Sequence, residues 1–394
     1  MRKVRQHFFF LLLLTANFGF TSPEFATIHK PMQTAHQQFS LSLFHSSFQD
    51  HKNVHICPLA IETLLKALSL GSYKVTAYDL QTVLKNPLVP DQLYDFHLET
   101  LQNLETALDK GEYIQKNAFY LSGGLTIDPQ FLAKAQKFGS IDVLQEDLKT
   151  SCGQKIQEWL NLRFKKNGFK FNELTHKETK GKISFISVVN YHLQWRFPFD
   201  PMITSIDSFQ YSSLETQGIV DMMEQVIEAD YFEDDLIQAA ALPLENHLTC
   251  LIFLPKKDGM NKLIALLEKP IYLKKIVSKM KQQAVHVKFP KIHLDNPVIY
   301  KDALLKIGLS QPFSKIADFR GIDSKHAICL DAPIQICRIN FNEGGINADL
   351  PGKIKRSIPL KTDVTIHLNH PFIFFIMDPR SFTILDAGCY QSPY

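Results

Sequence analysis

The stretch PFIFFIM, residues 371–377, decides the fold class of this chain. It contains no polar side chain, which predicts a strand covered by other parts of the protein on both faces. The run HLTCLIFLP at 247–255 predicts a second strand of this kind, and AHQQFSLSLFHSSF at 35–48 predicts a helix with one apolar side. Buried strands together with amphipathic helices indicate an α+β fold.

Further segments extend this pattern. AVHVKF (284–289) and TIHL (365–368) predict strands, and we expect short strands to cluster toward the C-terminus. Helices are predicted at 58–72, which opens with Pro58, and at 145–164. No Pro/Gly/Ser-rich linker divides the chain, so we expect one domain over residues 30–394.

The bulk composition limits the function classes. The chain has 394 residues, is 45% hydrophobic and includes 30 Phe, so it can bury a large core. The net charge of +3 comes from 43 basic and 40 acidic residues, and this balance gives no indication of a nucleic-acid partner or an anionic membrane.

The N-terminus predicts an export signal. Arg2, Lys3 and Arg5 precede the apolar run FFFLLLLTANFGF at 8–20, which is short for a membrane span. We expect a signal peptide over residues 1–22, cleaved between 19 and 26, and an extracellular or periplasmic protein with no membrane contact after cleavage. An uncleaved anchor is the alternative.

The cysteines give no metal-binding pattern. The six residues show neither CxxC nor Cys/His spacing, so we expect no metal site; they are Cys57, Cys152, Cys250, Cys329, Cys337 and Cys389. An even number in an exported chain permits disulfides, but buried free thiols are the commoner state.

Seven short motifs run in order toward the C-terminus: LSLGSYKVT (68–76), IQEWLN (156–161), WRFPFDP (195–201), MMEQ (222–225), LLKIGLSQPFS with ADFRGI (304–322), LNHPFIFFI (368–376) and AGCYQSP (387–393). Each resembles a motif of the serpin family, and the resemblance covers the chain from about residue 35 to the C-terminus. The resemblance implies three β-sheets, eight or nine helices and an exposed reactive-centre loop.

The resemblance also implies a mechanism. A serine protease, or a cysteine protease, attacks a bait bond in the loop, and the severed loop then inserts as a strand into the central sheet while the acyl bond holds the protease. This needs no cofactor and no catalytic residue, and the chain has no GxSxG, HExxH or P-loop, so we expect no enzyme activity. We expect a monomer.

The segment INFNEGG (339–345) resembles the strand end that leads into the reactive loop. The implied hinge is Glu343, Gly344, Gly345, Ile346, Asn347 and Ala348. Ile346, Ala348 and Leu350 alternate with polar residues, as an inserted half-buried strand requires. Pro351 opposes insertion because it lacks an N–H, and the β-branched Ile346 is bulkier than the Thr or Ser usual there.

The bait bond has several candidates. Arg356–Ser357 suits the Asp-lined pocket of a trypsin-like protease. In the family the reactive residue lies roughly sixteen residues after the hinge Glu, which from Glu343 gives Pro359, where the fixed backbone makes a poor substrate. Leu360 and Lys361 fit the count better and stay as alternatives.

The region that gates insertion differs from the family pattern. The family's shutter Asn, two helix Ser residues and His correspond to Ser187, Cys57, Ala60 and Gln335, near the matched Trp195. The polar network that keeps the central sheet closed in the family therefore has fewer members here, although Ser187 and Gln335 can still hydrogen-bond. Cys57 and Cys337 are expected to face the same space, either as a disulfide across the shutter or as two buried thiols.

Two function classes remain. The first is a suicide-type protease inhibitor, and the second is a non-inhibitory serpin-like binding or chaperone protein whose loop is an ordinary substrate. A heparin site is not expected, because FHLETLQNLETALDKGEY (96–113), at the family's cofactor helix, is acidic on balance.

Overall fold

The computed structural model describes residues 23–85, 113–138, 141–146, 152–163, 183–211, 217–256, 259–295, 297–331, 333–350 and 362–394. The predicted signal peptide at 1–22 and the acidic segment up to residue 112 lie outside these ranges. Their predictions therefore stay predictions, as does the extent of the domain.

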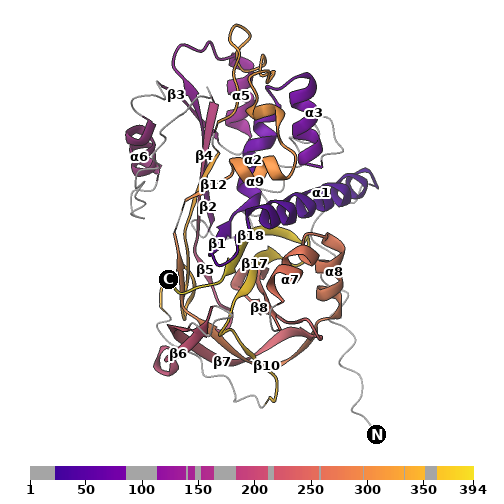
Figure 1. Ribbon diagram of the computed structural model, residues 1–394, viewed down its shortest axis with the longest axis vertical. Coiled ribbons are helices and arrows are strands. Elements are labelled where there is room, and N and C mark those ends of the chain that lie inside the picture. The colour runs from indigo at the N-terminus through magenta and orange to yellow at the C-terminus, as the bar shows by residue number, and fades with distance from the viewer. Residues whose placement is uncertain are drawn as a thin grey trace, which may run out of the picture.

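The strands of a five-stranded sheet run along the long axis of the molecule (Figure 1). Its strand order is β12 (Val298–Ile299), β13 (Ile334–Cys337), β4 (Ile183–Tyr191), β2 (Tyr113–Ser122) and β3 (Ile141–Glu146). The central strands β13 and β4 run parallel, with Gln335 opposite Ser187.

A four-stranded sheet prolongs this one. Its order is β11 (Ile292–Leu294), β14 (Ile339–Phe341), β15 (Gly345–Ile346) and β5 (Leu193–Gln194). Because β5 follows β4 and β14 follows β13 after one residue each, β15 lies in line with the boundary between β4 and β13.

The third sheet has nine strands. Eight follow the order β1 (Val54–Ile56), β18 (Thr383–Tyr390), β17 (Phe372–Asp378), β9 (Thr249–Pro255), β8 (Ile237–Pro243), β7 (Gln217–Glu233), β10 (Lys281–Pro290) and β16 (Thr365–His367), while β6 (Ser205–Gln210) pairs with β7. The apolar stretch that predicted the fold class is β17, buried from Phe372 to Met377 between β18 and β9. Its prediction is confirmed.

Eight α-helices lie within the described residues. They are α1 (Pro23–Ser47), α2 (Pro58–Ser69), α3 (Lys74–Val83), α5 (Pro129–Lys137), α6 (Cys152–Arg163), α7 (Met260–Leu267), α8 (Pro270–Lys279) and α9 (Lys301–Lys306), with short 3-10 turns at 201–203, 245–247 and 311–313. The α+β prediction is confirmed. In the described part of the chain, no helix combines the length and the apolar character needed to cross a bilayer.

Helices cover both faces of the five-stranded sheet. On one face, Trp159 and Leu160 of α6 pack against Ile186 and Ile336 of the two central strands. On the opposite face lies α2, whose residues from Pro58 to Leu68 are all buried. Figure 1 shows α6 and α2 on opposite sides of β4. The central strands are therefore enclosed between two helices.

One expectation from the sequence was incomplete and another was wrong in part. Short strands do cluster toward the C-terminus, where β11 to β16 each have two to four residues. The long strands β2, β4 and β7, with 10, 9 and 17 residues, were not predicted. Polar residues such as Asn117 and Ser187 interrupt their apolar pattern, yet the fold buries both. The helix expected at 145–164 is α6, and Gln145 and Glu146 belong to β3 instead.

Candidate functional site

The start of the predicted hinge already occupies a place in the sheet. Strand β15 lies between β14 and β5 and runs antiparallel to both, with Ile346 opposite Phe341 and Leu193. The amide of Asn347 donates to the Asn340 carbonyl oxygen at 2.8 Å. Ile346 is 0% exposed, so the bulk that the sequence flagged as an obstacle is accommodated.

A tight turn delivers the hinge to this position. The side-chain oxygen of Asn342 accepts from the amides of Gly344 and Gly345 at 2.9 and 3.0 Å, and its Nδ2 donates to the Ala348 carbonyl at 2.7 Å. Gly345 has a φ of 153°, and a Cβ there would lie 2.0 Å from the carbonyl oxygen of Leu193. The segment INFNEGG predicted the hinge, but nothing in its sequence indicated this role of Asn342.

The side chain of Glu343 stabilises this turn through an ion pair and a hydrogen bond. Its carboxylate lies 3.2 Å from Nζ of Lys291 and accepts a hydrogen bond from the Thr204 hydroxyl at 2.9 Å. Burial favours the neutral acid, but its own backbone amide, Thr204 and Lys291 outweigh this and lower the pKa of Glu343. The hinge glutamate is therefore held as a charged, hydrogen-bonded carboxylate.

Trp195 packs against the turn next to Asn342. Its indole Nε1 donates to the Asn342 carbonyl oxygen at 2.9 Å, and its ring stacks on Phe341 with 6.0 Å between centroids and 22° between planes. The edges of Phe199 and Phe289 contact it from other sides. Trp195 thus connects the turn to the core.

Gln335 carries the polar contacts of the predicted shutter. Its Oε1 accepts from the Cys57 amide at 2.8 Å and from the Tyr300 hydroxyl at 2.7 Å, and its Nε2 donates to the Cys57 carbonyl at 3.0 Å. These bonds connect β13 to Cys57, which precedes α2, and to Tyr300, which precedes α9.

The other shutter positions contribute little. Among the described residues, the buried Ser187 hydroxyl and both side-chain polar atoms of Asn117, its register neighbour on β2, have no hydrogen-bond partner. Ala60 is buried and offers no polar side-chain atom. The shutter network therefore runs through Gln335, and Ser187 does not take part in it.

Beside Gln335 lies a buried group made by His55, Cys57, Cys337 and Asp386. His55 Nε2 is 2.8 Å from an oxygen of Asp386, and its Nδ1 is 3.4 Å from the sulfur of Cys337. Burial lowers the pKa of His55, but the charges and hydrogen bonds of Asp386 and Cys337 outweigh it and raise the pKa to about 10. Burial raises the pKa of Cys337, but Cys57 and the charge of His55 lower it to about 7. Both thiols are free in this structure.

The bait-bond candidates lie outside the described residues. Arg356, Ser357, Leu360 and Lys361 fall within 351–361, together with Pro351. The structure therefore places the two ends of the loop, at Leu350 and Thr362, and the choice of bond stays a prediction.

Comparison with known proteins identifies the family. Residues 34–393 match the family described as Serpin (serine protease inhibitor), and the chain belongs to it. Members of this family are mostly protease inhibitors rather than catalysts.

Relatives and solved structures agree with this result. The chain is 26% identical to an uncharacterized serpin-like protein of Thermococcus kodakarensis over 92% of this chain and 86% of that protein. It is 23% identical to human alpha-1-antichymotrypsin, with coverage of 88% and 84%.

The fold matches Serpin48 of Tenebrio molitor at a TM-score of 0.81 and 20% identity, covering 93% and 99% of the two chains. It also matches thyroxine-binding globulin in complex with thyroxine at 0.80 and 20%, covering 92% and 99%. The predicted serpin fold, with three sheets, is confirmed.

Proposed function

We propose that this protein is a suicide-type inhibitor of serine proteases that works by insertion of its cleaved loop between β4 and β13. The observation that carries the proposal is the position of β15. The chain has already begun a strand between β5 and β14, and the next residues along that line would enter the boundary between β4 and β13.

The register supports a continuous path. Phe341 and Leu193 flank Ile346 and differ by 341 − 193 = 148, and the paired residues Gln335 and Ser187 also differ by 335 − 187 = 148. No bulge therefore separates the two levels of the sheet. An inserted residue i would lie opposite residue 539 − i on β4 and 687 − i on β13.

This register assigns the shutter position to Gly352. It would lie opposite 539 − 352 = 187 and 687 − 352 = 335, which are Ser187 and Gln335. The side chain of Gln335 bonds to Cys57, which precedes α2, so a residue inserted opposite Gln335 would point toward the start of α2. Glycine adds no side chain there, so the loop sequence is compatible with insertion at this position.

The same register supports Arg356–Ser357 as the bait bond. Arg356 would lie opposite Ile183, the first residue of β4, which faces Leu330 across the boundary. Cleavage after Arg356 would release a strand that spans β4 from Tyr191 to Ile183. Cleavage after Leu360 or Lys361 would leave residues beyond the end of the strand.

Pro351 favours the second candidate, a non-inhibitory binding protein. Thyroxine-binding globulin, a structural neighbour, is described with bound thyroxine. Pro351 would remove an N–H from the inserted ladder, which would slow insertion so that the protease hydrolyses the acyl bond first. In this case the loop would be cleaved as an ordinary substrate.

Incubation with trypsin tests the proposal. An inhibitor would give an SDS-resistant complex with the protease, and its cleaved form would unfold at a higher temperature than the intact protein. Arg356→Ala should abolish the complex with trypsin, whereas Lys353→Ala should not. Complete cleavage without complex and without a gain in Tm, with a panel of serine and cysteine proteases, would exclude the inhibitor.

The proposal also covers the target protease, the location of the protein and its oligomeric state. The target would be a trypsin-like protease outside the cell or in a periplasm, and the inhibitor would act as a monomer without heparin. Mass spectrometry of the fragment released near residue 360 would identify the bond.

A further inference from the structure

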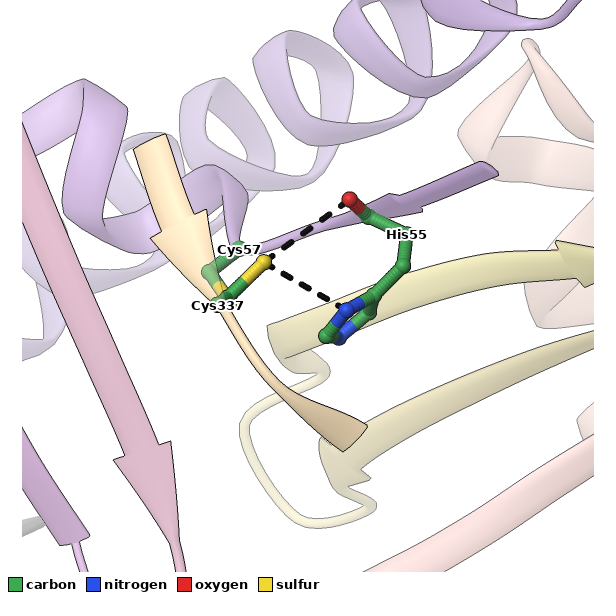
Figure 2. Close-up of side chains that lie close together, drawn as sticks. All are labelled: His55, Cys57 and Cys337. Atoms are coloured by element: carbon green, nitrogen blue, oxygen red, sulfur yellow. Dashed lines mark hydrogen bonds between the residues drawn. The ribbon is translucent and has the colours of Figure 1, made fainter. Parts of the chain in front are cut away.

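Three donor atoms meet in the buried space beside the shutter. His55 lies on β1, Cys57 directly precedes α2, and Cys337 ends β13. Their donor atoms, the imidazole nitrogen and two sulfurs, all lie within 4.8 Å of one another. Figure 2 shows the His55 ring turned toward the sulfur of Cys337, with Cys57 beside them. The three residues are 1–6% exposed.

The spacing fits ligands of one metal ion. Zn²⁺ binds sulfur at about 2.3 Å and imidazole nitrogen at about 2.0–2.1 Å, so two such ligands in a tetrahedral arrangement lie about 3.5 Å apart. The distance from His55 Nδ1 to Cys337 Sγ is 3.4 Å. These donors can therefore converge on an ion without a large movement of the backbone.

Asp386 lies beside both His55 and Cys57. Its Oδ2 is 2.8 Å from His55 Nε2 and 3.5 Å from Cys57 Sγ, so it can hold Nε2 protonated and leave Nδ1 free toward the Cys337 sulfur. A carboxylate in this position is the usual outer partner of a metal-bound histidine. Its Oδ1 is buried and has no hydrogen-bond partner in the described part of the chain.

Simpler roles explain fewer of these residues. Core packing would account for two buried thiols but not for a buried His–Asp pair between them. A disulfide between Cys57 and Cys337 would use the thiols and leave the orientation of His55 unexplained. Bound metal would use all four side chains.

We propose that His55, Cys57 and Cys337 form a buried binding site for a thiophilic metal ion, either Zn²⁺ or Cu⁺. Thiolate and imidazole ligands suit both ions. The ion would join β13 to the start of α2, alongside the bonds of Gln335. Binding at this site does not depend on the proposed inhibition.

The structure also explains why sequence spacing did not predict the site. His55 and Cys57 are two residues apart, but Cys337 lies 282 residues after His55. No short motif covers such a set. This proposal departs from the expectation that the chain has no metal site.

The test uses the full mature chain, refolded under reducing conditions with Zn²⁺ and, in parallel, with Cu⁺. Refolding loads the ion because the site is closed in the folded protein. After desalting against a weak chelator, metal per chain is measured by mass spectrometry, and the reactivity of native thiols is measured with a maleimide. Cys57→Ser and Cys337→Ser remove ligands, and Cys329→Ser, which changes a half-buried thiol elsewhere, is the matched control.

The wild type and the Cys329→Ser variant should each keep about one ion per chain of at least one metal, with a raised Tm. The two ligand variants should keep none and show no such gain in Tm. If they do not fold, the wild type alone decides the matter: in a mild denaturant that opens the buried site, two more thiols should react with the maleimide after removal of the metal than before it. The proposal is overturned if the wild type keeps neither metal, if a folded ligand variant keeps it, or if Cys57 and Cys337 form a disulfide despite equimolar metal.

Discussion

Replacement of Pro351 by Ala should speed loop insertion. The amide of Asn347 donates to the Asn340 carbonyl, toward β14, and odd-numbered hinge residues would continue this direction along an inserted strand. By the same register, residue 351 would donate to the carbonyl of Ile336 on β13, since 687 − 351 = 336. Proline has no N–H to give, whereas alanine restores the bond.

The magnitude follows from one hydrogen bond. A backbone hydrogen bond contributes about 1 kcal/mol net, and a buried carbonyl left without a donor costs about 1–3 kcal/mol. If the bond forms before insertion passes its slowest point, about 1.4 kcal/mol corresponds to a tenfold faster insertion. The fraction of protease caught as covalent complex depends on insertion relative to hydrolysis, so it should rise accordingly.

The assay measures covalent complex against cleaved inhibitor on an SDS gel, at several ratios of inhibitor to trypsin. Pro359→Ala is the matched control, because residue 359 would lie beyond Ile183 at the end of β4 and outside the ladder. We expect a larger share of complex for Pro351→Ala and no change for Pro359→Ala. An unchanged or smaller share for Pro351→Ala would refute the register on which this reasoning depends.

Three further predictions concern the described site. Gln335→Ala should lower the free energy of unfolding, measured in urea, by about 2–4 kcal/mol, because it leaves buried hydrogen-bond partners unpaired. Ser187→Ala should change this free energy by less than about 0.5 kcal/mol, and equal effects of the two variants would contradict the assigned network. Trp195→Phe should lose about 1–2 kcal/mol, since it removes one hydrogen bond and part of a stacked ring, and limited proteolysis at the hinge should become faster than in a Trp159→Phe control. The pKa of Glu343 is lowered in the folded protein, so its contribution to stability is present above pH 4.5 and disappears as the pH falls through the lowered pKa. Glu343→Gln should reduce this loss of stability in acid, measured by urea unfolding at several pH values. An unchanged pH dependence would rule out the Glu343–Lys291 ion pair as its source.

The sequence predicted much of the fold because the relevant signals are local. An apolar run such as 371–377 can only be stable with both faces covered, and the structure places it in the middle of the nine-stranded sheet. The ordered family motifs indicated the family and predicted the hinge at 343–348. Long strands that include buried polar residues, such as β2 with Asn117, gave a weaker pattern and were missed.

The site depended more on tertiary structure. The sequence indicated that Ser187 and Gln335 were both able to hydrogen-bond, but only the fold decided that Gln335 bonds to α2 while Ser187 finds no partner among the described residues. The role of Asn342 was also hidden, since an Asn in a turn is common and its three bonds appear only when the turn is formed.

By itself, the sequence determined the α+β fold class and the family, because these follow from local periodicity and from matched motifs, and it predicted a position for the hinge. Only the tertiary structure decided that Ile346 has already entered the sheet and that His55, Cys57 and Cys337 share one buried space. The physical reason is that both features depend on strand register and on contacts between residues far apart in the chain. No property of the separate segments contains that information.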